Sequence, residues 1–101
     1  MINIDTIKEG SELTVKLEGD LDRTTAASTE ERVLSELAGV EQLIIDFDKL
    51  AYISSAGLRV LVKLCKQMEG HGTMAVINAD KSVADIISLS GLKDYLNVKE
   101  K

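Results

Sequence analysis

Two adjacent serines, Ser54 and Ser55, hold the position in this sequence that best suits chemistry. Apolar residues with helical spacing follow them, so both stand at the predicted start of a helix. A serine there can cap the helix by accepting a hydrogen bond from a free backbone N–H. It can also accept a phosphoryl group, because free N–H groups and the helix dipole tolerate the roughly −1.5 to −2 charge of phosphoserine. The two roles are compatible, since one serine can cap while its neighbour is modified.

Gly57 lies two residues beyond Ser55, inside the same predicted helix. A glycine within a helix costs about 1 kcal/mol relative to alanine, so its presence needs a reason. One explanation is close packing of the first helical turn on the sheet. The other is steric clearance for a partner that approaches Ser55. The sequence leaves both open.

Four aspartates, Asp20, Asp22, Asp46 and Asp48, fall in two predicted loops. Paired carboxylates can perform acid–base chemistry or bind a metal ion. Their spacing matches no metal motif, and the only histidine, His71, lies in a separate glycine-rich turn. Turn and cap roles account for the four carboxylates better, with partner contacts as the remaining role. We therefore expect neither a metal nor a cofactor.

The sequence lacks the common signatures of catalysis. It has no catalytic-triad pattern, no phosphate loop with Gly-Lys-Ser/Thr, and no Gly-x-Gly-x-x-Gly segment. Cys65 lies on the apolar face of a predicted helix and is expected in the core. These features predict a protein that is not an enzyme.

Composition narrows the class of protein further. The 101 residues, 45% of them hydrophobic, predict one domain spanning 1–101. The net charge is −5 and the twelve basic residues are scattered, which argues against nucleic acid or an anionic membrane as a direct partner. No apolar stretch approaches the roughly 20 residues of a membrane span. With one cysteine and no signal-peptide pattern, we expect a cytoplasmic protein, either a monomer or a weak dimer.

Hydrophobic periodicity predicts the elements that position these residues. Alternating or continuous apolar runs predict strands at 2–7, 13–17, 43–45 and 74–77, with a final short strand near 95–98. Helical spacing predicts helices at 24–39, 54–70 and 80–91. We further expect a turn at 19–22, an end of the central strand at 46–48 and a connection at 49–53.

This order, a hairpin followed by strand–helix alternation, predicts an α/β fold with a mixed sheet and helices packed on it. Sites in open sheets of this kind gather at the carboxyl ends of the strands, beside helix N-termini. Two loops, 19–25 and 46–57, would meet at that end if their strands adjoin.

Four segments of the chain together resemble the STAS domain. They run from Gly19 to Asp22, from Leu43 to Phe47, from Tyr52 to Leu58 and from Ser90 to Leu92. Within that superfamily the chain is most similar to the stand-alone bacterial anti-sigma factor antagonists, from its first strand to Val98. The resemblance implies a STAS-like mixed β-sheet of four to five strands with three to four α-helices packed on it.

The resemblance also implies a partner-switching function. The unphosphorylated protein would bind an anti-sigma factor that is also a serine kinase, and so free a sigma factor. Phosphorylation at Ser55, with Ser54 as a second candidate, would release it, and a serine phosphatase would reset it. Asp22 matches the acidic residue that lies near the acceptor in the family. The residues expected to contact the partner are Asp20, Asp22, Thr24, Ser54, Ser55, Ala56, Gly57 and Arg59.

The chain departs from the family at Ser54, where the motif commonly has aspartate. This change removes one like charge beside a phosphoserine. Two other functions stay open. One is a STAS subunit of another assembly, such as a lipid-transport complex or a stress-signalling particle. The other is a small enzyme or ligand-binding domain that uses the loop carboxylates.

Overall fold

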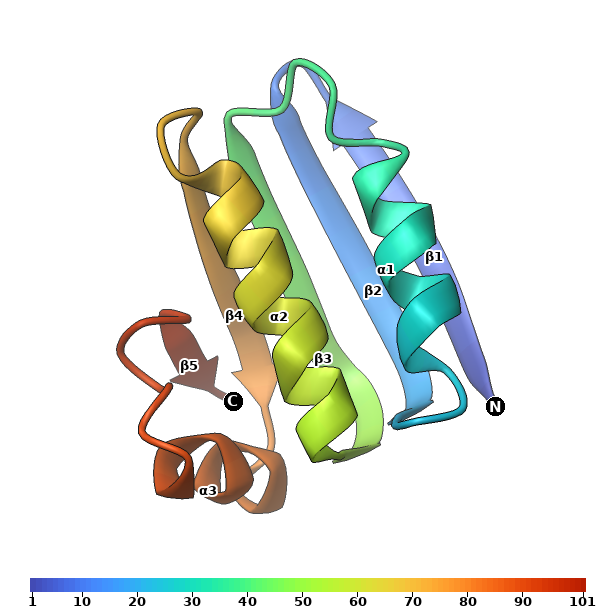
Figure 1. The fold of residues 1–101 in the computed structure, drawn as a ribbon, viewed down its shortest axis with the longest axis vertical. Coiled ribbons are helices and arrows are strands. Elements are labelled where there is room, and N and C mark those ends of the chain that lie inside the picture. Colours follow the sequence, from blue (N-terminus) through green and yellow to red (C-terminus); the bar gives the residue numbers. More distant parts are fainter.

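The computed structural model describes all residues 1–101 as one mixed sheet with three helices (Figure 1). In chain order the elements are β1 (Ile2–Glu9), β2 (Glu12–Leu21), α1 (Ala26–Leu34), β3 (Gln42–Ile53), α2 (Ser55–Met68), β4 (Thr73–Ala79), α3 (Lys81–Leu89) and β5 (Val98–Glu100). The predicted α/β fold and its element order are confirmed.

The five strands follow the chain order β1-β2-β3-β4-β5 across the sheet. β1 pairs antiparallel with β2, and every later pair is parallel. Parallel strands point the same way, so the carboxyl ends of β2, β3 and β4 lie at one end of the sheet. The helices α2 and α3 begin at that end.

The helices α1 and α2 lie side by side over one face of the sheet, while α3 lies across the end of β4 (Figure 1). Alternation in β2 sends Leu13, Val15 and Leu17 toward these helices, where all three are buried. Leu61 and Leu64 of α2 meet them from the other side of the core. None of the three helices is both long enough and apolar enough to cross a membrane.

Two expected strand ends are wrong, because both strands continue. β2 runs through the expected turn to Leu21, and β3 runs through the expected connection to Ile53. The pairing shifts register twice along them, and β3 contains the extra residue each time. These bulges break the alternation, so the buried residues Phe47, Leu50 and Ile53 are spaced by three instead of two.

The helices also differ in detail from expectation. α1 ends at Leu34, before the expected end near Gly39. Leu89 is one of the apolar residues, with Val83, Ile86 and Ile87, that predict the last helix, yet it is 89% exposed. The start of α2 at Ser54 and Ser55 agrees with expectation. The sequence offers both Asn78 and Asp80 as caps for the last helix, and the structure has Asp80 as the N-cap of α3.

Candidate functional site

The ends of β2 and β3 lie side by side and bring two segments together. Leu21 pairs with Ile53 in the parallel register. Beyond that pair, the backbone N–H of Ser54 donates to the carbonyl of Leu21 at 3.0 Å. The segment 22–25 and the start of α2 therefore share one end of the sheet, as the sequence predicted.

The segment between β2 and α1 is held by its own side chains. Asp22 Oδ1 accepts from the backbone N–H of Thr24 at 2.8 Å and from its hydroxyl at 2.7 Å. Thr25 Oγ1 donates to the carbonyl of Asp20 at 2.8 Å and accepts from the N–H of Asp22 at 2.9 Å. The segment is thus held by several hydrogen bonds, with Arg23 and Thr24 exposed and Thr25 buried.

The same contacts stabilise the negative charge of Asp22. The hydroxyl of Thr24, and then its backbone N–H, lower the pKa of the Asp22 carboxyl below its usual value of 3.8. Both donors favour the ionised form. A fixed negative charge therefore stands beside the start of α2 at neutral pH.

The two serines take different roles at the start of α2. Ser54 is the N-cap residue, and its Oγ accepts from the backbone N–H of Gly57 at 3.3 Å. Ser55 is the first residue of the helix and is exposed. The capping role that the sequence could assign to either serine therefore falls to Ser54, and the hydroxyl of Ser55 is accessible.

Gly57 is buried against the end of β2. A Cβ at this position would lie 2.5 Å from the carbonyl oxygen of Leu21 and 2.8 Å from Cγ1 of Ile53. Real Cβ atoms do not approach backbone oxygen so closely, and the carbonyl cannot move without disturbing the sheet. Of the two explanations left open by the sequence, the structure supports close packing.

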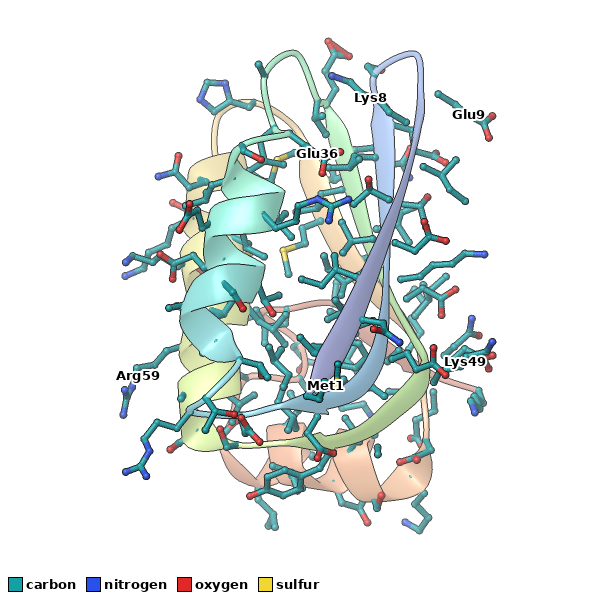
Figure 2. All side chains as sticks on the ribbon, turned by 90° about the vertical axis from the view of Figure 1, so that its right-hand side faces the viewer. Met1, Lys8, Glu9, Glu36, Lys49 and Arg59 are labelled. Carbon is teal, nitrogen blue, oxygen red and sulfur yellow. The ribbon has the colours of Figure 1, made fainter.

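Most of the other expected contact residues are at least partly accessible. Thr24 and Arg59 are exposed, and Asp20 and Ala56 are partly exposed. Arg59 follows Ser55 by four residues, which is about one helical turn. Figure 2 shows Arg59 pointing away from the sheet on the helix side of the molecule.

Asp46 and Asp48 do not belong to this site, which corrects the expected loop 46–57. Both lie within β3. Asp46 accepts from the side-chain amide of Asn78 at 3.1 Å, and Asp48 pairs with Lys101 at 3.3 Å. The chain has no group of three or more His, Cys, Asp or Glu placed to hold a metal ion.

Thr25 is a residue of the site that sequence reasoning did not select. It is buried, and its hydroxyl joins the end of β2 to the start of α1. From the sequence, Thr25 could be expected only to cap the following helix, as Thr24 could. In the structure its side chain makes no capping hydrogen bond. Its actual partners lie three and five residues earlier, so they depend on the path of the backbone.

Comparisons with known proteins find relatives over nearly the whole chain. A model of the family described as "STAS domain" matches residues 3–101. The anti-sigma-B factor antagonist of Staphylococcus aureus is 26% identical over 102 residues, which cover 98% of this chain and 94% of that protein.

Solved structures show the same fold. An anti-sigma factor antagonist from Mycobacterium paratuberculosis superposes with a TM-score of 0.90 at 20% identity, over 100% of this chain and 87% of the other. The anti-sigma factor antagonist SpoIIAA in its unphosphorylated form gives a TM-score of 0.83 at 16% identity, over 100% of this chain and 88% of the other.

Proposed function

The chain belongs to the STAS domain family, and we propose that it acts as an anti-sigma factor antagonist. It binds an anti-sigma factor in the cytoplasm and so frees a sigma factor, without catalysing a reaction itself. The similarity to proteins named anti-sigma-B factor antagonists supports this role. The observation that carries the proposal is that Ser54 caps α2 and leaves the neighbouring Ser55 exposed, as a phosphoacceptor must be.

Phosphorylation of Ser55 switches the binding off. The partner is itself a serine kinase, and it transfers a phosphoryl group from ATP to the antagonist it has bound. The new charge of roughly −1.5 to −2 then lies in a desolvated interface beside the ionised Asp22. A charge left buried and unpaired costs several kcal/mol. A loss of ~3 kcal/mol weakens binding more than a hundredfold.

The fold itself tolerates this modification. Ser55 is the first residue of α2, where the helix dipole stabilises an anion and several backbone N–H groups lack helical acceptors. The core lies on the other side of the helix. The switch therefore needs no large conformational change, and a serine phosphatase restores the binding form.

Ser55 is favoured over Ser54 as the acceptor on two grounds. Ser54 is less exposed, and its oxygen already accepts from Gly57. Ser55 also matches the acceptor position of the family motif. Ser54 replaces the aspartate common in the family, so the phosphoserine here has one neighbouring negative charge fewer.

The proposal is tested by incubating the protein with ATP and a candidate anti-sigma factor kinase encoded in the same genome. Intact mass should rise by roughly 80 Da, the mass of one phosphoryl group, and peptide mapping should place it on Ser55. Complex formation should be lost at the same time. An adduct on Ser54 would keep the mechanism and move its site. Binding without any adduct would leave a plain binding module.

Substitutions at Ser55 test whether an added negative charge, rather than loss of the hydroxyl, weakens partner binding. Ser55→Ala should fold and bind the anti-sigma factor constitutively, whereas Ser55→Asp and Ser55→Glu should fold and bind poorly. Calorimetric titration measures the affinities, and circular dichroism checks the fold. Equal affinities for Ser55→Ala and Ser55→Asp would count against the switch.

A further inference from the structure

A groove runs between α1 and α2 and continues to the start of α2. It has a volume of about 450 Å³. Its lining residues are Ala26, Ala27 and Glu30 of α1, and Ala56, Arg59, Val60, Val62, Lys63 and Lys66 of α2. Three alanines and two valines form an apolar floor. Such small side chains let another chain approach the helix backbones closely.

The α2 side of this groove is basic. Arg59, Lys63 and Lys66 are all exposed, and α2 contains no acidic residue, although the whole chain has a net charge of −5. Lys63 pairs across the groove with Glu30 at 3.2 Å. Arg59 and Lys66 belong to none of the five ion pairs of the chain. Two unpaired positive charges therefore border an apolar floor.

Helix stability explains only part of this stripe. A cation in the last turn, such as Lys66, is favoured by the helix dipole. Arg59 lies in the N-terminal half of α2, where a cation gains nothing from the dipole. The spacing of the three residues by four and three positions keeps them on one face, which is the face toward the groove.

We propose that this groove docks an acidic amphipathic helix of the anti-sigma factor. The apolar side of that helix packs on the alanine floor, and its carboxylates pair with Arg59 and Lys66. The inference rests on the proposed function, since it names the part of the partner that α2 recognises. Ala56 and Arg59 border both the groove and Ser55, so a helix in the groove places the partner beside the phosphoacceptor.

The test measures the affinity of the full-length protein for the anti-sigma factor kinase that binds the wild type. Lys66→Glu should weaken binding at least tenfold, because it sets a negative charge against the acidic helix. The matched control is Lys49→Glu, which makes the same charge change on the opposite side of the molecule (Figure 2) and should change affinity less than twofold. Melting curves confirm that both variants fold.

Salt dependence and cross-linking identify the occupant. Lys66→Gln should bind with a shallower dependence on salt than the wild type, because one screened charge pair is gone. A carbodiimide joins lysine amines directly to carboxylates, so it should link Lys63 or Lys66 to Asp or Glu within one helix of the partner. Cross-links from Lys49 instead, or equal affinities for Lys66→Glu and Lys49→Glu, would overturn the docking proposal.

The experiments distinguish a failure of the proposed function from a failure of the groove proposal. If the wild type binds no candidate anti-sigma factor, the proposed function fails. If the wild type binds, Ser55→Asp does not bind, and Lys66→Glu binds like the wild type, the function stands and the groove proposal is wrong. Lys66-dependent binding of the wild type to anionic lipid vesicles would show that the groove takes a lipid surface, and would also overturn the proposal.

Discussion

The helices α2 and α3 begin at the same end of the sheet, each after a parallel strand. Each is capped by a side-chain oxygen that accepts from the N–H three residues later. Ser54 accepts from Gly57 at 3.3 Å, and Asp80 accepts from Val83 at 2.9 Å. The two helix starts are thus capped in the same way. They differ in the charge of the cap and in the state of the nearby serine hydroxyl.

The start of α3 already holds an anion. Asp80 accepts from Val83 and also from the hydroxyl of Ser82 at 2.8 Å, which engages the nearby serine. The start of α2 has a neutral cap, and its next serine, Ser55, is exposed. The start of α3 carries its own carboxylate, while the start of α2 has a neutral cap beside an exposed hydroxyl. If Ser55 is the phosphoacceptor, as proposed, one local motif serves structure at α3 and regulation at α2.

The largest expected effect is on partner affinity, and it should differ between the starts of α2 and α3. Ser55→Asp should weaken binding to the anti-sigma factor by about a hundredfold or more. Ser82→Asp adds the same charge to the first turn of α3 and should leave affinity within twofold. Surface plasmon resonance with immobilised partner measures both. Similar losses in the two variants would mean that general negative charge at this end of the sheet, not the site at Ser55, controls binding.

The next largest effect is on stability at the third residue of each helix, where both substitutions should destabilise the fold for opposite steric reasons. Gly57→Ala should destabilise the fold by about 1–3 kcal/mol, because the new methyl group meets the carbonyl of Leu21. The equivalent position of α3 is Val83, which is buried and fills its space. Val83→Ala should also destabilise, because it empties part of the core. Denaturant unfolding measures both, and a stabilising Gly57→Ala would contradict the close packing.

Much of this architecture was predictable from the sequence, because local patterns determine it. Alternation of Leu13, Val15 and Leu17 predicted a strand with one buried face, as β2 has. The apolar spacing of α2 gave its length and its buried side. Because sites in such sheets gather at the carboxyl ends of the strands, the segment near Asp22 could also be predicted to lie beside Ser55.

The parts that could not be predicted depend on contacts distant in sequence. The bulges of β3 place Phe47, Leu50 and Ile53 three residues apart, which matches no strand period. Whether Ser54 or Ser55 caps α2 depends on where the helix starts. That start is set by the hydrogen bond from Ser54 to Leu21 in a neighbouring strand.

The caps should differ in how they respond to pH. The backbone N–H of Val83, and then the hydroxyl of Ser82, lower the pKa of Asp80 below its usual value of 3.8. An acid with a depressed folded-state pKa stabilises the fold above its unfolded pKa, and this contribution is lost as pH falls through the folded pKa. The gap in melting temperature between wild type and Asp80→Ala should therefore be constant near neutral pH and narrow below about pH 4.

Ser54→Ala provides the comparison. It should cost about 1 kcal/mol, a usual value for loss of a serine cap. This cost should not change with pH, because the serine hydroxyl does not titrate. A gap for Ser54→Ala that narrows in acid along with that for Asp80→Ala would indicate that another group, not the cap of α3, causes the pH dependence.

The smallest expected effect tests whether the neutral cap makes α2 receptive to a phosphate. Ser54→Asp gives α2 the carboxylate cap that α3 has, and alone it should leave stability unchanged or slightly raised. Ser55→Asp in that background puts two negative charges side by side, so the double variant should be less stable than the sum of the single changes by about 0.5 kcal/mol. Denaturant unfolding of the four proteins at low salt measures this coupling, which added salt should reduce. If the changes are additive, the helix start accommodates two anions, and the replacement of the family's aspartate by Ser54 does not ease phosphorylation.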